Sequence, residues 1–509
     1  MQVLFRADAS QRMGHGHVMR CLTLADALAA RGARSHFACR EHPGHLAPLI
    51  ETRGHAVTVL PIDAGDARSL GAASLKDADD TCAVAARVSG PIDWIIADHY
   101  AIDADWEERI SASAGRVMVI DDLANRRHVC ELLLDQNLVA NAETRYDKWL
   151  SPACARLVGP KFALLRPEYA RRQAVTPVRS GAIRCILIAF GGADGANLTE
   201  RALTAALDAV LETRSAATID VVLSPNAIHL TRIEARARSH TAVRVHAAPD
   251  SLAPLIARAD LAIGASGTTN WERLCLGLPT LVISTARNQQ PIAAALHDAG
   301  LVHWLGDAAD VSDAVLRAAI VLRLGQGADS RCSALCMATV DGRGADRVAT
   351  ILTATGASPL SARVVTVGDE ALLLAWSNDP MTRAQGFSPE PIAAENHQQW
   401  LRRKLTAADT CHFYIVEVSD EPVGQVRFDR LAAAWEVHYS VSPAFRRRGI
   451  GAAMLACALR ALARAEPDAP VIGHVKASNV ASRRIFESLG FRTSVASDGV
   501  VACHGRAGA

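Results

Sequence analysis

The sequence lacks the features that would assign it to a membrane, secreted or nucleic-acid-binding class. No apolar run approaches the ~20 residues that a membrane-spanning helix needs. The chain reaches Arg6 and Asp8 too early for a signal peptide. The net charge is +1 over 509 residues, so the charge balance gives no reason to expect nucleic acid or an anionic membrane as the main partner. We therefore expect a cytoplasmic protein.

Paired cysteines and repeats are also missing. The 12 cysteines are scattered without a Cys-x-x-Cys motif, and Cys332 and Cys336 are the closest pair. In a large chain without an export signal, such cysteines are typically free buried thiols. The sequence has no short-period repeat and no low-complexity tract. Its length predicts roughly three globular domains.

Short apolar strands alternate with amphipathic helices over residues 1–175 and again over 181–355. Strands are expected at 3–5, 35–39, 57–60, 93–97, 117–120 and 132–134, and then at 183–190, 221–223, 243–245, 261–263 and 280–284. Several of the first set end in polar residues, as in Asp98-His99-Tyr100 and Asp121-Asp122. Loops at the carboxyl ends of parallel strands carry function in doubly wound sheets. We therefore predict an α/β fold with two Rossmann-like lobes, joined by a hinge at 176–181, with a ligand cleft between them.

Beyond a linker at 355–361, the pattern changes to α+β. Strands are expected at 363–367, 412–418, 424–428 and 435–441, and helices at 370–376 and 395–405. Residues 360–509 are therefore predicted to form a third domain.

The first candidate site is the glycine-rich turn before a helix that should begin near His17. Gly14 and Gly16 let the backbone approach a ligand, and the helix N-terminus favours an anion. The same helix end favours a neutral histidine, so His17 is a candidate base; a structural histidine bonded to a carbonyl is the alternative. A two-metal hydrolase site formed by His15, His17 and residues 98–99 and 121–122 is a further alternative.

The second lobe carries two strand-to-helix turns of small residues, Gly191-Gly192 and Ser266-Gly267-Thr268-Thr269. Backbone N–H groups and hydroxyls in such turns can hold a pyrophosphate. Glu272, one helical turn on, is placed to accept hydrogen bonds from ribose hydroxyls, or it only complements the helix dipole. Asn288-Gln289 is a polar turn that closes on the sugar or caps the next helix.

These motifs resemble those of a known family. Arg6-x-Asp8 with Gly14-x-Gly16-His17-Val18-Met19-Arg20 is similar to the first-strand motif of the UDP-sugar hydrolases of the pseudaminic acid pathway, relatives of the GT-B glycosyltransferases of the MurG type. The stretch from Ser266 to Pro279 resembles their nucleotide-binding motif, and Asn288-Gln289 the turn that follows it. The resemblance covers residues 1–355.

This resemblance implies hydrolysis of UDP-2,4-diacetamido-2,4,6-trideoxy-β-L-altropyranose to UDP and the free sugar, without a metal. His17 would be the base that activates water, and Tyr100 would line the sugar pocket as the second catalytic residue. The implied substrate-binding and UDP-binding residues are Arg6, Asp8, Gly14, Gly16, Arg20, Gly191, Gly192, Ser266, Gly267, Thr268, Thr269, Glu272, Asn288 and Gln289.

The third domain contains a loop rich in arginine and glycine, Arg446-Arg447-Arg448-Gly449-Ile450-Gly451-Ala452, between a strand ending at Val441 and a helix. Such a loop can cradle a pyrophosphate through backbone N–H groups and the helix N-terminus. Arg446-x-x-Gly449-x-Gly451 resembles the acetyl-CoA-binding signature of GNAT acetyltransferases. The stretch from Asn479 through Ser482 to Phe491 resembles their closing motif, so the resemblance implies acetyl-CoA as co-substrate.

Residues 376–380 with Glu395-x-His397-x-x-Trp400 are similar to the acetyltransferase of the same pathway, which acetylates the 4-amino group of a UDP-linked amino sugar. Many GNAT enzymes protonate the leaving CoA thiolate with a Tyr where this chain has Phe486. Water or Tyr439 would have to replace it.

Together the two resemblances imply a bifunctional enzyme that acts on consecutive steps. Three alternatives stay open. The first is a GT-B glycosyltransferase, the second is the metal-dependent hydrolase, and the third is a non-catalytic sugar-nucleotide sensor whose acetyltransferase domain modifies a protein.

Overall fold

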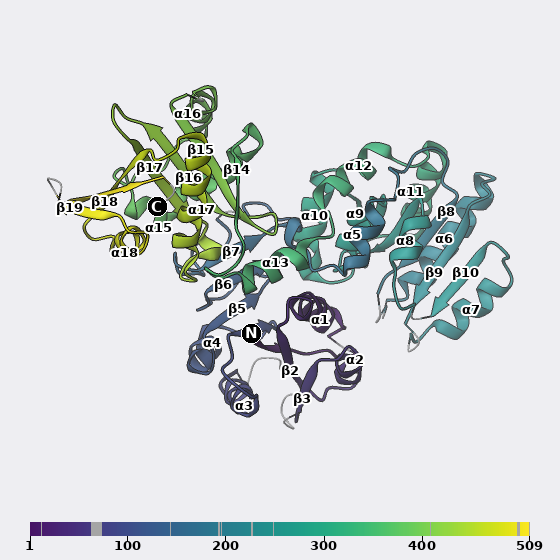
Figure 1. Cartoon of the computed structure of the whole chain (residues 1–509). Helices are drawn as coiled ribbons and strands as arrows, with labels where there is room; N and C mark the ends of the chain where they lie inside the picture. Colours follow the sequence, from purple (N-terminus) through teal and green to yellow (C-terminus); the bar gives the residue numbers. More distant parts are fainter. Residues whose placement is uncertain are drawn as a thin grey trace. The chain divides into compact units, whose positions relative to one another are not determined.

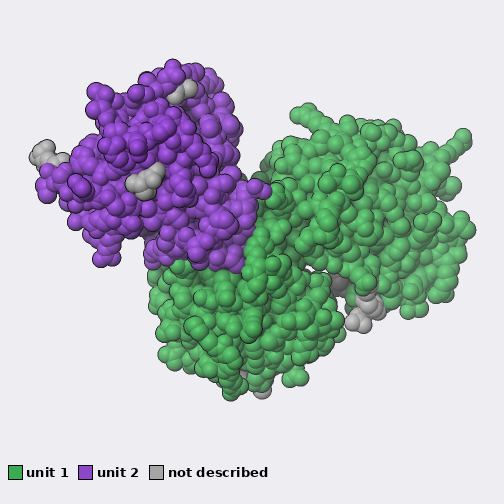
Figure 2. All heavy atoms as spheres, in the orientation of Figure 1, with its two compact units in different colours: residues 1–150, 157–348 green, residues 151–156, 349–509 purple. Residues whose placement is uncertain are grey.

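The chain folds into two compact units, which Figure 2 shows in different colours. The computed structural model describes residues 1–509 except 12, 63–73, 143, 192–193, 195, 225–226, 248, 408, 496–498 and 508–509. Unit 1 comprises residues 1–150 and 157–348, and unit 2 comprises residues 151–156 and 349–509. Within the described part of the chain, no helix is long and apolar enough to cross a membrane.

The first lobe is built on a seven-stranded sheet in the order β3-β2-β1-β4-β5-β6-β7. The pairs from β3 to β6 are parallel. Its strands are β1 (Gln2–Ala7), β2 (Arg34–Arg40), β3 (Ala56–Leu60), β4 (Trp94–Asp98), β5 (Arg116–Ile120), β6 (Leu132–Asp135) and β7 (Ala155–Val158). Its helices are α1 (Gly16–Ala29), α2 (Ala47–Thr52), α3 (Ser74–Arg87) and α4 (Ala104–Ile110).

The central strands of this sheet are buried on both faces. All five residues of β4 are buried, and β1 is buried from Val3 to Ala7. Figure 1 shows α1 and α2 on one side of the sheet and α3 and α4 on the other. A parallel sheet covered on both faces requires such continuous apolar strands, which end in polar residues only where they reach the loops.

The second lobe repeats this plan with a six-stranded parallel sheet in the order β10-β9-β8-β11-β12-β13. Its strands are β8 (Cys185–Ala189), β9 (Thr218–Leu223), β10 (Val243–Ala247), β11 (Leu261–Ala265), β12 (Thr280–Ser284) and β13 (His303–Asp307). The helices of this part of the chain are α5 (Pro167–Gln173), α6 (Leu198–Glu212), α7 (Leu230–Arg238), α8 (Ala253–Arg258), α9 (Thr269–Cys275), α10 (Gln290–Asp298), α11 (Asp313–Gln326), α12 (Ser330–Thr339) and α13 (Gly344–Thr353).

Unit 2 contains a mixed seven-stranded sheet in the order β14-β15-β16-β17-β18-β20-β19, antiparallel except for the parallel pair β17–β18. Its strands are β14 (Ser361–Val364), β15 (Cys411–Val418), β16 (Glu421–Arg430), β17 (Trp435–Val441), β18 (Pro470–Lys476), β19 (Arg492–Val495) and β20 (Val500–Arg506). Its helices are α14 (Glu370–Asn378), α15 (Pro380–Gln385), α16 (Ala394–Thr406), α17 (Ile450–Ala465) and α18 (Val480–Ser488).

The predicted fold class is confirmed: two Rossmann-like lobes precede an α+β domain. Strands β7, β13 and β18 to β20 were not predicted. β13 is half-buried along its whole length and β19 is exposed throughout, so neither carries the apolar run by which a strand is recognised. The strand expected over 363–367 ends at Val364, because Thr366 and Asp369 form a capping box that starts a helical turn.

Candidate active sites

His17 lies in the first turn of α1, beside the carboxyl end of the sheet. Its Nδ1 lies 2.6 Å from Oδ1 of Asp98, the last residue of β4, which pairs with Ala7 of β1. His17 is 7% exposed and Asp98 is fully buried. Because the carboxylate accepts the proton on Nδ1, the lone pair of a neutral His17 is on Nε2. This histidine–aspartate pair is therefore arranged to act as a base.

Arg20, one helical turn further along α1, contacts the same carboxylate. Its Nε lies 2.5 Å from Oδ2 of Asp98 and its Nη2 lies 2.6 Å from Oδ1. Burial alone would raise the pKa of Asp98, but Arg20 and His17 hold that pKa well below its ordinary value. Asp98 is thus an anion that fixes the His17 ring. The predicted contact of Arg20 with substrate stays a prediction.

Tyr100 lies beside His17 and connects the two lobes of unit 1. The two rings are edge to face, with centroids 4.7 Å apart. The phenol oxygen accepts a hydrogen bond from Nδ2 of Asn288, 3.3 Å away in the second lobe. A Cβ added to Gly16 would lie 3.7 Å from the Thr268 methyl group. The structure therefore brings together the two motifs that are about 250 positions apart in the sequence.

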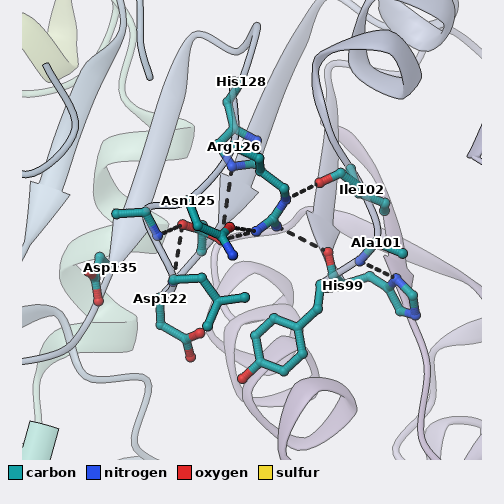
Figure 3. Close-up of polar contacts among 12 residues, drawn as sticks. His99, Ala101, Ile102, Asp122, Asn125, Arg126, His128 and Asp135 are labelled. Carbon is teal, nitrogen blue, oxygen red and sulfur yellow. Dashed lines mark hydrogen bonds and ion pairs between the residues drawn. The ribbon is translucent and has the colours of Figure 1, made fainter. Parts of the chain in front are cut away.

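Arg126 holds the loop that carries Tyr100. Figure 3 shows Arg126 between the segment of Asp122 and Asn125 and the segment of His99 and Ile102. Its Nε donates to the carbonyl oxygen of Ile102 at 2.6 Å, and its Nη1 lies 2.8 Å from Oδ1 of Asp121. The strand-end loops of β4 and β5 are therefore fastened to each other beside the base.

Arg6 and Asp8, predicted to bind substrate, pair with each other in the interior. Nη1 of Arg6 lies 2.7 Å from Oδ1 of Asp8, and Nη2 lies 2.7 Å from Oδ1 of Asp77. Asp8 also accepts the backbone N–H of Arg40 at 2.7 Å. Both residues are at most 2% exposed. In this structure they hold the ends of β1 and β2 and helix α3 together, and contact with substrate stays a prediction.

The alternative two-metal site is not assembled. Among the residues that the structure describes, no group of three or more His, Cys, Asp and Glu is placed to hold a metal ion. Asp98 is engaged by His17 and Arg20, and Asp121 accepts the N–H of Ala124 at 2.8 Å and pairs with Arg126.

The motif that begins at Ser266 leads β11 into α9. Ser266 is buried and accepts a hydrogen bond from Nδ2 of Asn270 at 3.0 Å, and Arg273 donates to Oδ1 of Asn270 at 2.5 Å. These bonds fix the turn from inside. The partly exposed residues of the turn are Gly267, Thr268 and Thr269.

The other predicted nucleotide residues lie around this turn. Glu272 is on α9, where burial raises its pKa and the Tyr169 hydroxyl of α5 opposes that shift. Gln289 accepts the backbone N–H of Thr285 at 2.9 Å and so closes its own loop. Gly191 has a φ of +91°, a conformation that favours glycine. Gly192 lies outside the described residues.

In unit 2, the loop after β17 opens beside a gap in the sheet. β17 and β18 pair only at Trp435 with Val471 and at Glu436 with Ile472, and beyond these positions each strand pairs only with its other neighbour. Gly449 has a φ of +73° and is the N-cap of the 16-residue helix α17. A left-handed glycine before a long helix directs backbone N–H groups toward one point, as an anion requires.

Arg446, the first residue of the signature, pairs within unit 2. Its Nη2 lies 2.6 Å from Oδ2 of Asp379 and 2.9 Å from Oγ1 of Thr382, and its Nε donates to the carbonyl of Val441 at 3.2 Å. Arg446 thus fixes the loop. Anion contact by Arg447, Arg448, Ile450, Gly451 and Ala452 stays a prediction.

Tyr439 lies on β17, one of the two parted strands. Its hydroxyl lies 2.7 Å from Oγ of Ser482 on α18, and Asn479 caps that helix by accepting the N–H of Ser482. Burial raises the pKa of Tyr439 to about 12, so the phenol keeps its proton at neutral pH. Phe486 is 1% exposed, and a Cβ added to Gly473 would lie 2.5 Å from its Cζ. Phe486 packs under the sheet.

The sequence pattern gave Asp98 a role only in the alternative metal site and did not pair it with His17. The signal was the polar residue that ends the apolar strand β4. Its pairing with His17 depends on β1 and β4 being neighbours in the sheet, which the local pattern does not specify.

Comparisons with known proteins agree with this division of the chain. Residues 360–492 match the family described as the acetyltransferase (GNAT) domain. A UDP-2,4-diacetamido-2,4,6-trideoxy-beta-L-altropyranose hydrolase of Campylobacter jejuni is 25% identical over 302 residues, which is 59% of this chain and 97% of that protein. An uncharacterized protein of Methanocaldococcus jannaschii is 23% identical over 517 residues, with 97% of both chains covered.

The crystal structure of MurG from Acinetobacter baumannii shares the fold of the first unit. It aligns with a TM-score of 0.50 and 16% identity, and covers 69% of this chain and 99% of its own. The chain therefore has two lobes with the GT-B fold, is homologous over 59% of its length to a UDP-sugar hydrolase, and ends in a domain that matches the GNAT acetyltransferase family.

Proposed function

We propose that unit 1 hydrolyses UDP-2,4-diacetamido-2,4,6-trideoxy-β-L-altropyranose to UDP and the free sugar, and that unit 2 uses acetyl-CoA to acetylate the 4-amino group of the UDP-sugar precursor. Both reactions belong to the biosynthesis of pseudaminic acid. The observation that carries the hydrolase half is the buried pair of His17 and Asp98 beside Tyr100. The relative from Campylobacter jejuni, matched over 97% of its length, supports the substrate.

In the hydrolysis step, Nε2 of His17 removes a proton from water as the water oxygen attacks the anomeric carbon. The bond from that carbon to the diphosphate oxygen breaks, and UDP leaves with the electron pair. Asp98 stabilises the imidazolium that forms, in the manner of a carboxylate behind a catalytic histidine. The turn at Gly267, Thr268 and Thr269 would hold the diphosphate through its backbone.

In the acetylation step, the Arg446–Ala452 loop would hold the pyrophosphate of acetyl-CoA at the start of α17. The parted strands β17 and β18 leave backbone groups available to the pantetheine arm. Tyr439 would donate its proton to the departing CoA thiolate, because Phe486 has none to give. The match to the GNAT family over residues 360–492 supports this half.

The two reactions fit one another chemically. The product of acetylation is the diacetamido sugar nucleotide that unit 1 would hydrolyse. The relative from Methanocaldococcus jannaschii, aligned over 97% of both chains, supports a conserved pairing of the two units.

The test is to incubate the purified chain with the UDP-diacetamido sugar and no acceptor, and to follow the reaction by phosphorus and proton NMR. We expect UDP and free sugar to appear together. Intact UDP-sugar after long incubation would reject the hydrolase. Turnover that requires an added sugar or lipid acceptor would instead identify a glycosyltransferase.

The same assay tests the metal-free mechanism. EDTA should leave the rate of UDP release unchanged, because in the proposed mechanism the base is the histidine–aspartate pair of His17 and Asp98, which needs no metal ion. A loss of activity that zinc or manganese restores would contradict it.

A further inference from the structure

A cluster of carboxylates and histidines lies where β17 and β18 part. Glu436 is the last residue of β17 that pairs with β18. Its Oε1 lies 2.7 Å from Nδ1 of His474 on β18, and its Oε2 lies 3.4 Å from Nε2 of His438. Asp429 of β16 places a second carboxylate 3.7 Å from the same Nε2. Two anions therefore face one imidazole at the gap between the strands.

His438 is the member of this cluster that solvent reaches most easily. Its side chain is 42% exposed, against 24% for Glu436 and 18% for Asp429. The cations next to the cluster are Arg427, 2.9 Å from Asp429 on the same strand, and Lys404 of α16, 2.7 Å from Asp429. With Nε2 toward the carboxylates, the tautomer protonated on Nε2 is favoured and the lone pair lies on Nδ1.

Acetyl transfer to an amine needs such a base. A primary amine with a pKa of about 10 is an ammonium ion at neutral pH and has no lone pair to attack a thioester. Burial and the neighbouring Arg427 lower the pKa of His438 below its ordinary value, so its ring is neutral and able to accept a proton at pH 7.

We propose that His438 is the base that deprotonates the acetyl acceptor, and that this acceptor is a primary ammonium ion drawn to the gap by Glu436. The proposal rests on the proposed acetyl transfer. It adds the residue that activates the acceptor and the carboxylate that attracts it.

Nδ1 of His438 takes one proton from the ammonium ion, and the free amine attacks the carbonyl carbon of acetyl-CoA. The new C–N bond forms and the C–S bond breaks. Tyr439 donates its proton to the departing thiolate. The nitrogen then loses its second proton, which returns to the Tyr439 oxygen. Glu436 and Asp429 stabilise the His438 imidazolium until it returns its proton to solvent.

The experiment measures thiol release by the full chain from acetyl-CoA, between pH 6.5 and 10, for wild type, His438→Gln and Glu436→Gln. The acceptors are the UDP-4-amino sugar and an unrelated primary amine, spermidine. At pH 7 we expect kcat/KM of His438→Gln to fall by roughly 10²- to 10⁴-fold. The loss should shrink by about tenfold per pH unit, since hydroxide in bulk water then supplies the free amine. Glu436→Gln should show a smaller loss with the same pH dependence.

His504→Gln is the matched control, because His504 is an exposed histidine of the same sheet, on β20, whose ring nitrogen contacts Ser494. It should behave as wild type. Calorimetric titration of acetyl-CoA and thermal melting should be unchanged in His438→Gln, which separates a lost base from a lost fold.

A wild-type rate in His438→Gln at pH 7, or an equal loss at every pH, would overturn the assignment of the base while leaving acetyl transfer in place. Transfer to spermidine but not to the UDP-amino sugar would overturn the proposed sugar, and the same variants would then decide the role of His438 with spermidine. Transfer to no amine would overturn both.

Discussion

At the scale of single residues, the chemistry proposed for unit 1 depends on one buried ion network. Asp98 faces His17 on one oxygen and is held by Arg20 on both. An isolated carboxylate at this depth would become protonated rather than stay charged. Arg20 keeps it ionised, and an ionised Asp98 is what fixes the His17 tautomer with its lone pair on Nε2.

His17→Asn should therefore fold normally and lose UDP release by roughly 10²- to 10⁴-fold in kcat. The asparagine amide can still donate to Asp98, so the buried carboxylate keeps a partner. Steady-state UDP release, with circular dichroism as the check on folding, measures the effect.

His55→Asn is the matched control for that variant. His55 is also 7% exposed and its Nε2 lies 2.8 Å from a carboxylate oxygen of Asp26, but it is remote from Tyr100 in the described structure. It should keep wild-type turnover. Near-wild-type turnover in His17→Asn would remove His17 from the mechanism.

Asp135, at the end of β6, has a raised pKa, whereas the pKa of Asp98 is lowered. Burial raises its pKa from 3.8 to about 6 despite Arg145 nearby. Because the folded-state pKa is raised, its contribution to stability is fully present below about pH 4 and is lost as the pH rises through 6. At pH 7 the loss amounts to at most about 3 kcal/mol.

Asp135→Asn should accordingly flatten the pH dependence of the first unit's melting temperature between pH 4 and 7, as measured by scanning calorimetry. The exposed Asp310→Asn should keep the wild-type slope. An unchanged slope in Asp135→Asn would contradict the raised pKa.

At the scale of elements, each candidate site lies at a loop that connects a strand to the following helix. In unit 1 the turn before α1 lies close to the turn before α9, since a Cβ added to Gly16 would be in ordinary van der Waals contact with Thr268. In unit 2 the turn before α17 is shaped by Gly449 at a φ of +73°. Glycine is favoured at such a position because a left-handed backbone is sterically unfavourable for other residues.

Gly449→Val should weaken acetyl-CoA binding at least tenfold, since the loop loses the backbone conformation that faces the pyrophosphate. The control is Gly499→Val. Gly499 has nearly the same φ, +72°, and no atom within 4 Å of an added Cβ, but it lies between β19 and β20. Calorimetric titration should show a loss only in Gly449→Val. Equal losses in both variants would mean that strain, not the loop, explains the effect.

At the scale of the whole molecule, the two proposed activities predict that one chain carries out both reactions in sequence. Given acetyl-CoA and the UDP-4-amino sugar, the wild-type chain should release CoA, UDP and the diacetamido sugar. His17→Asn should accumulate the UDP-diacetamido sugar, and Gly449→Val should leave the amino sugar unconverted. NMR of the mixture distinguishes these products.

Mixing the two variants tests whether the units act independently. The mixture should restore release of the free sugar, because the UDP-diacetamido sugar made by one chain can be hydrolysed by the other. Continued accumulation of that intermediate in the mixture would contradict independent sites.

The sequence by itself determined the architecture. Apolar strands that end in Asp98, Asp121 and Asp135 predict parallel sheets, because only strands buried on both faces need to be apolar throughout. The change of pattern after 361 separated the last domain. The edge strands β13 and β19 escaped prediction because an edge or exposed strand has no apolar pattern to read.

Only the tertiary structure decided which side chains meet. His17 and Asp98 are 81 positions apart, and they pair because β4 lies beside β1 in the sheet order. The local sequence pattern assigns the charges of Arg6, Asp8 and Arg446 to ligand binding. In the fold, Arg6 pairs with Asp8, and Arg446 pairs with Asp379. A charge that is buried must be paired, and the sequence does not state which distant residue will supply the partner.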